Sequence, residues 1–71
     1  MAEGVYRVTE VVGSSSESWE KATAVAVETA AKTLRDLRVA EVAEQDVKIE
    51  NGQVAAYRVK LRISFKLEAS D

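Results

Sequence analysis

Residues 47–67 read VKIENGQVAAYRVKLRISFKL and contain the clearest structural pattern in the chain. Asn51-Gly52 is a strong hairpin signal, because both residues tolerate the positive φ angles of a type I′ turn. Beyond the turn, apolar and polar residues alternate, as expected for a strand with one buried face. The apolar row, which should cover a helix, contains Tyr57, Val59, Leu61, Ile63, Phe65 and Leu67. The stretch therefore predicts a β-hairpin with arms at residues 39–50 and 53–68.

A two-residue turn also predicts the register of the two arms. Pairing should start with Glu50 opposite Gln53 and continue one residue at a time. On the helix side, the expected pairs are Leu61 with Val42 and Ile63 with Ala40. On the far side, the expected pairs are Arg62 with Glu41, Arg58 with Gln45, Ala56 with Val47 and Val54 with Ile49.

The N-terminal half predicts one strand and one helix. β-forming residues run from Val5 to Val12, and Gly13 with three serines should end the strand. Ser14 and Glu17 fit a capping box, although Ser15 and Ser16 are also competent caps. Apolar residues at helical spacing predict a helix from about Ser16 to Asp36. The result is an α+β fold of βαββ order, with a three-stranded antiparallel sheet wrapped around one helix. We expect a single domain over residues 1–71.

Composition excludes several classes of protein. The 71 residues contain no cysteine and no histidine, so thiolate sites and the commonest general base are absent. With no nucleophile motif either, we expect no enzyme activity. The net charge of −2 disfavours nucleic acid as a partner, and no apolar run is long enough to span a membrane. The first five residues resemble no signal peptide, so we expect a cytoplasmic protein.

The far side of the predicted sheet is unusually apolar. A chain of this size buries a small core, and no disulfide can reinforce it. Contiguous apolar patches usually mark interfaces, although β-branched residues also favour strands on either face. We therefore expect self-association through Val39, Val47, Ile49, Val54 and Ala56.

The order and spacing of several short motifs resemble the dodecin family over residues 5–68. The motifs are Val11-Val12-Gly13-Ser14-Ser15, Thr33-Leu34-Arg35-Asp36-Leu37, Ala40-Glu41-Val42, Tyr57-Arg58-Val59 and Ser64-Phe65-Lys66-Leu67-Glu68. The resemblance implies a hollow homo-dodecamer that stores or sequesters a small ligand or cation. In the best-known members, flavin lies between tryptophans at two-fold interfaces, and a glutamine of the last strand bonds its ring.

This chain differs from the flavin-binding pattern at both positions. Val39 replaces the tryptophan and Arg58 replaces the glutamine, so the aromatic stack and a two-sided amide contact are both lost. The predicted ligand site, with Gln45 opposite Arg58, is Val39, Gln45 and Arg58. The segments Ser18-Trp19-Glu20 and Arg38-Val39-Ala40 resemble a branch described as calcium-binding. We therefore expect calcium as the ligand in preference to flavin (FMN or riboflavin).

Two sets of charged residues are candidate ligand groups. The resemblance places Glu17 and Glu44 where related shells hold acidic groups near cations; the alternative is that both are solvated charges. The basic row Arg58, Lys60, Arg62 and Lys66 could hold the phosphates of coenzyme A, or could pair with acids across the sheet. Alternatives to a calcium protein are a flavin-binding dodecin and a purely structural oligomer without a small ligand.

Overall fold

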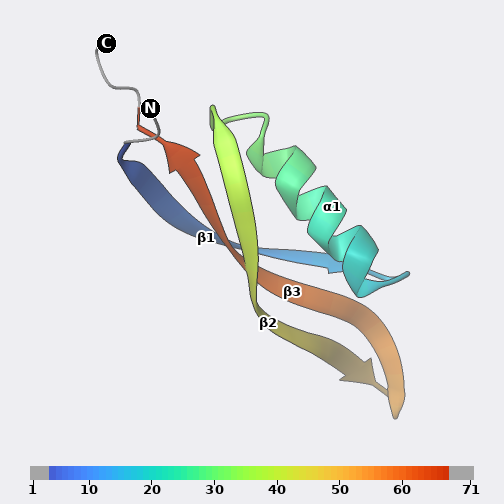
Figure 1. Cartoon of the computed structure of the whole chain (residues 1–71). Helices are drawn as coiled ribbons and strands as arrows, with labels where there is room; N and C mark the ends of the chain where they lie inside the picture. Colours follow the sequence, from blue (N-terminus) through green and yellow to red (C-terminus); the bar gives the residue numbers. More distant parts are fainter. Residues whose placement is uncertain (1–3, 68–71) are drawn as a thin grey trace.

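A computed structural model describes residues 4–67 and has the order βαββ (Figure 1). The elements are β1 (Tyr6–Ser15), α1 (Trp19–Ala30), β2 (Leu37–Glu50) and β3 (Gln53–Lys66). The strands form one antiparallel sheet in the order β1-β3-β2. The predicted α+β fold is therefore confirmed. The expected end of the last strand at residue 68 lies outside the described residues.

The core consists of one row of β3 and one face of α1. Val59, Leu61 and Ile63 are at most 1% exposed, because β3 is the central strand and its inner row lies under the helix. The helix contributes Ala22, Ala26 and Ala30, which are four residues apart and therefore share one face. These small side chains let helix and sheet approach closely. The predicted inward row of β3 and the alanine-rich helix face are both confirmed.

Gly13 marks the point where α1 approaches β1. A Cβ atom at this position would lie 2.4 Å from the Ala22 carbonyl oxygen and 2.8 Å from the Ala26 Cβ. Only glycine fits at that separation. The residue does not end the strand, because Gly13 pairs with Val59 and β1 continues to Ser15. The predicted break at Gly13 is therefore wrong.

The helix is shorter than predicted at both ends. Its N-cap is Ser18, whose hydroxyl oxygen accepts a hydrogen bond from the Lys21 N–H at 2.9 Å. The predicted capping box of Ser14 and Glu17 is wrong, since the Glu17 N–H instead donates to the Ser15 hydroxyl. At the other end α1 stops at Ala30, and a tighter turn follows.

The turn after α1 satisfies the helix carbonyls and reverses the chain. The N–H groups of Lys32 and Thr33 donate to carbonyls three residues earlier, and that of Leu34 donates to Ala30. Asp36 then adopts a left-handed φ of 59°, directly before β2 begins at Leu37. Leu34 and Leu37 still pack against the core, as their helical spacing suggested, but outside the helix.

The hairpin register agrees with the prediction at both ends and differs in the middle. Asn51 and Gly52 have φ angles of 53° and 75°, which confirms the predicted turn. A shift between Lys48 and Ile49 adds one residue to β3, and a second between Val42 and Glu44 adds one to β2. The predicted pairs of Arg58 with Gln45 and Ala56 with Val47 are therefore wrong. The actual pairs are Arg58 with Asp46, Ala56 with Lys48, Val47 with Tyr57 and Gln45 with Val59.

The hairpin extends beyond the helix. α1 packs on β1 and β3, and Figure 1 shows the tip of the β2–β3 hairpin lying away from α1. This exposed end of the sheet presents Ile49 and Val54, which are 65% and 50% exposed. Over residues 4–67, α1 is too short and too polar to be a membrane span.

Candidate ligand site and interface surfaces

Asp46 and Arg58 form a bidentate ion pair in the middle of the hairpin. The Arg58 Nε donates to Asp46 Oδ1 at 2.8 Å and its Nη2 donates to Oδ2 at 2.9 Å. The hydrogen bonds from Arg58 hold the pKa of the Asp46 carboxyl below its ordinary value, and the carboxylate raises the pKa of Arg58. Both side chains are about half exposed, so solvent screens the pair, but its fork geometry fixes the guanidinium in place.

Asp46 of β2 also holds the start of the helix in place. The Trp19 indole Nε1 donates to the Asp46 carbonyl oxygen at 3.0 Å. Its ring meets the Tyr57 ring edge-on, with centroids 5.0 Å apart and an interplanar angle of 77°. Trp19 therefore joins α1 to both strands of the hairpin. These two contacts make Trp19 an anchor of the fold.

Ion pairs cross the outer face of the sheet, away from the helix. Glu10 of β1 accepts from Arg62 at 3.1 Å and lies 4.0 Å from the Lys60 Nζ. Arg62 also lies 3.7 Å from Glu41 of β2, which agrees with the predicted pairing. Three members of the predicted basic row thus have acidic neighbours within the chain. These exposed pairs offset the charge that coenzyme A phosphates would need.

The predicted ligand residues do not meet within one chain. Val39 pairs with Ser64, six residues along β3 from Arg58, which is a separation of roughly 20 Å at the spacing of a strand. Residues an even number apart share a face, so Val39 and Arg58 both lie on the outer side. Gln45 pairs with the buried Val59 and faces the helix side instead. The predicted proximity of Gln45 and Arg58 is therefore wrong.

Asp46 is the residue that the sequence prediction left out of this site. Its role follows from the register shift, which replaces Gln45 by Asp46 opposite Arg58. A signal for the shift exists in the sequence. Residues 54–57 are four apolar residues in succession and interrupt the alternation of β3 at that point. Such an interruption in an alternating strand is typical of a β-bulge.

The candidate metal residues belong to different parts of the chain. Glu17 lies in the connection before α1, and Glu44 lies in the middle of β2. Within residues 4–67, no three acidic side chains come together in a way that could hold a metal ion. Calcium takes six to eight oxygen ligands, so one subunit does not supply a complete site. The flavin pattern does not fit either, because Val39 presents no ring to stack.

Large apolar side chains remain on the surface of the isolated chain. Val39 and Ile49 are 63% and 65% exposed, Val54 is 50% exposed, and Val47 and Ala56 are half-buried. Tyr57 faces the helix, because its ring contacts Trp19 of α1. Val47 lies opposite Tyr57 and therefore also faces the helix. Ile49 follows two residues later on the same strand and takes the same side. Val54 pairs with Ile49 and therefore also takes this side. The prediction that Val47, Ile49 and Val54 lie on the far face is wrong.

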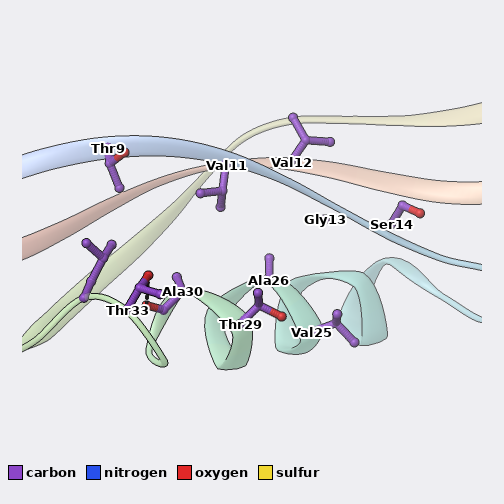
Figure 2. Close-up of a pocket in the computed structure, with 11 residues that line it drawn as sticks. Thr9, Val11, Val12, Gly13, Ser14, Val25, Ala26, Thr29, Ala30 and Thr33 are labelled. Atoms are coloured by element: carbon purple, nitrogen blue, oxygen red, sulfur yellow. Dashed lines mark hydrogen bonds between the residues drawn. The ribbon is translucent and has the colours of Figure 1, made fainter.

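A groove runs between the edge strand β1 and the helix. It has a volume of about 510 Å³, and Figure 2 shows Val11 and Ala26 on its two walls. Its lining is apolar apart from hydroxyl groups, with Val12, Val25 and Leu34 beside Thr9, Thr29 and Thr33. Because β1 is an edge strand, the groove is open along the side of the sheet. Exposed strand edges beside apolar surface are typical places for association.

Comparison with known proteins identifies relatives that match nearly the whole chain. The family model described as Dodecin matches residues 5–68. A Mycobacterium tuberculosis protein named calcium dodecin is 44% identical over 63 residues, which cover 89% of each chain. A Thermus thermophilus protein named dodecin is 42% identical over 64 residues, covering 90% of this chain and 93% of the relative.

Solved structures give the same result. Dodecin from Streptomyces coelicolor superposes with a TM-score of 0.90 at 46% identity, covering 99% of this chain and 100% of the other. The Mycobacterium tuberculosis calcium dodecin, described as calcium-chelating with a novel calcium-binding site, gives a TM-score of 0.81 at 43% identity, covering 94% and 96%. The agreement extends over the whole βαββ unit. The chain therefore belongs to the dodecin family of non-enzymatic, small-ligand-binding proteins.

Proposed function

We propose that the chain assembles into a homo-dodecamer that binds and sequesters calcium at sites shared between subunits. The main support is the mismatch between core and surface in one chain. The buried core is three alanines with Val59, Leu61 and Ile63, whereas larger apolar side chains stay exposed on every strand. A domain with so small a core gains stability by burying apolar surface against copies of itself.

Calcium is favoured over flavin by the residues at the predicted ligand positions. Val39 offers no aromatic face, and the Arg58 fork is already occupied by the Asp46 carboxylate. A relative 44% identical to this chain is named calcium dodecin. Since one subunit brings too few oxygens together, symmetry-related copies of Glu17 and Glu44, completed by water, are the proposed ligands.

A cytoplasmic location remains a prediction.

The cation proposal is tested by thermal unfolding of the assembled protein with millimolar calcium or magnesium. A ligand that binds only the folded state raises the melting temperature, by an amount equivalent to about 2.7 kcal/mol at one hundred times Kd. We expect a rise with calcium and a smaller or no rise with magnesium. The double variant Glu17→Gln/Glu44→Gln should lose the rise.

The control is Glu28→Gln, which removes an exposed carboxylate from the last turn of α1, away from Glu17 and Glu44. It should keep the calcium response of the unmodified protein. An equal calcium response in the double variant and in the control would contradict the assignment of Glu17 and Glu44. No response in the unmodified protein to calcium, flavin or coenzyme A would favour the purely structural oligomer.

Flavin binding is the second candidate, because Val39 and Arg58 share the outer face as a flavin pocket requires. We expect Val39→Trp with Arg58→Gln to create flavin affinity in the assembled protein. Aromatic stacking contributes about 0.5–1.5 kcal/mol beyond burial, and two rings would act on one flavin. Quenching of flavin fluorescence measures the gain. Unchanged fluorescence with the double variant would mean that the pocket does not persist.

A further inference from the structure

The tip of the β2–β3 hairpin carries an apolar surface that its own helix leaves uncovered. Ile49 and Val54 pair across the two strands, so their side chains lie close together on the helix-facing side. They are 65% and 50% exposed, and the tip extends beyond α1 (Figure 1). An exposed apolar pair at the end of a projecting hairpin is typical of a contact surface.

The charges on the opposite side of the tip neutralise each other. Lys48 and Glu50 alternate with Ile49 along β2, so they point to the outer face. Their side chains form an ion pair with Nζ and Oε2 3.3 Å apart. The tip can therefore bury its apolar side without taking an isolated charge out of water, which would be costly.

The groove between β1 and α1 is complementary to this tip. Figure 2 shows Val11 of β1 on one wall and Val25 and Ala26 of α1 on the other. Among the residues that the structure describes, those that line the groove carry no charge. Its volume of about 510 Å³ lies within the range of pockets that hold whole small molecules, so it has room for two aliphatic side chains.

We propose that the hairpin tip of one subunit occupies the groove between β1 and α1 of a neighbouring subunit, with Ile49 and Val54 as the inserted side chains. The tip projects away from its own α1, and β1 and β2 are opposite edges of the sheet, so the contact is between copies (Figure 1). A contact between two different surfaces is head-to-tail and builds a ring when the rotation closes. This inference rests on the self-association stated in the proposed function.

A second copy accounts for more of the exposed surface than a small apolar ligand does. A ligand in the groove would leave Ile49 and Val54 in water, whereas a neighbouring tip covers the groove and the tip in a single contact. The gain from burying apolar surface grows with the area removed from water. A domain with a small core therefore gains more from the contact that covers both surfaces.

The test is cross-linking between introduced cysteines, because the chain has no cysteine of its own. The assembled double variant Val25→Cys/Ile49→Cys is treated with a short bismaleimide and separated on a denaturing gel. We expect a ladder of covalent species longer than a dimer, since each tip is linked to the groove of the next subunit. Thr29→Cys, which also lies in the groove, replaces Val25→Cys should that variant fail to fold.

The matched control is Val25→Cys/Val39→Cys. Val39 is as exposed as Ile49, at 63% against 65%, but lies on the outer face of the sheet, so this variant should give no ladder. An equal ladder in the control would overturn the proposal, because cross-linking would then be unspecific. Dimers from Ile49→Cys alone would also overturn it, since two tips would then contact each other.

The mass of the particle separates this inference from the proposed function. A monomeric unmodified protein would remove the basis of both. An assembled Val25→Cys/Ile49→Cys variant that gives no ladder would overturn only the contact between tip and groove and would leave self-association in place. Native mass spectrometry of the unmodified protein would then show whether a small ligand fills the groove instead.

Discussion

Gly13 determines how closely the helix can lie on the sheet. Its absent side chain leaves room for the Ala22 carbonyl and the Ala26 methyl group. We expect Gly13→Ala to lower the free energy of unfolding by about 1–3 kcal/mol, since overpacking forces the helix outward. Chemical denaturation at fixed protein concentration measures the change.

Gly4→Ala is the matched control for this substitution. An added Cβ at Gly4 would have its nearest neighbours at 3.5 Å or more, which is ordinary contact. The two variants make the same chemical change, and only the one at Gly13 should destabilise the fold. Equal stability of both would show that the close approach of α1 and β1 is not a real constraint.

The Asp46–Arg58 pair should make stability depend on pH. Arg58 lowers the pKa of Asp46 in the folded chain, so its contribution is complete above the unfolded pKa and is lost as pH falls through the lower folded pKa. The free energy of unfolding should therefore fall more for the unmodified protein than for Asp46→Asn between about pH 5 and pH 2. Glu28→Gln should retain the full slope. Equal slopes in all three proteins would contradict the pairing.

At the scale of elements, the strongest local signals predicted the fold well. Asn51-Gly52 fixed the turn, and the alternating row around Leu61 identified the buried face of β3. The middle of the hairpin was not predictable by counting from the turn. One extra residue on each strand shifts the register and then restores it, so Glu41 still pairs with Arg62 while Arg58 moves to Asp46.

The helix start shows how a local motif can mislead. Several serines precede α1, and each is a competent cap, so the sequence alone did not distinguish them. Tertiary contacts decide the choice, because Trp19 must reach the Asp46 carbonyl and Gly13 must pass under Ala22. Only Ser18 then stands directly before the first turn.

Capping by Ser18 makes a direct prediction. Ser18→Ala should lower the free energy of unfolding by about 1 kcal/mol, since it removes the acceptor for the Lys21 N–H. Ser14→Ala, at the cap suggested by the capping-box motif, should stay within about 0.5 kcal/mol of the unmodified protein. Thermal unfolding followed by circular dichroism compares them. A larger loss of stability for Ser14→Ala than for Ser18→Ala would contradict capping by Ser18 and favour the cap expected from the sequence.

At the scale of the whole molecule, the candidate site is the part that the sequence predicted least. The resemblance indicated the positions of Val39 and Arg58, but a single chain keeps them far apart, because Val39 of β2 pairs with Ser64, six residues along β3 from Arg58. Sites shared between subunits depend on symmetry, which no pattern along one chain encodes. The expectation of self-association came from the sequence nevertheless, because a short chain carries apolar residues beyond its predicted core.

The hairpin tip should take part in assembly. Val54 is 50% exposed and pairs with Ile49 at the end that extends beyond the helix. Val54→Asp places a charge where we expect a buried contact, so it should dissociate the assembly while Val54→Ala leaves it intact. Sedimentation velocity distinguishes the two. An unchanged large particle with Val54→Asp would exclude this end of the hairpin from the interface.

Self-association of the chain can be measured from the mass of the particle in dilute solution. Light scattering coupled to size exclusion should give about 94 kDa for twelve chains of 7.8 kDa each. The exposed apolar side chains would then be covered by neighbouring subunits. A folded species of 7.8 kDa would contradict the account, because the proposed calcium sites need more than one chain.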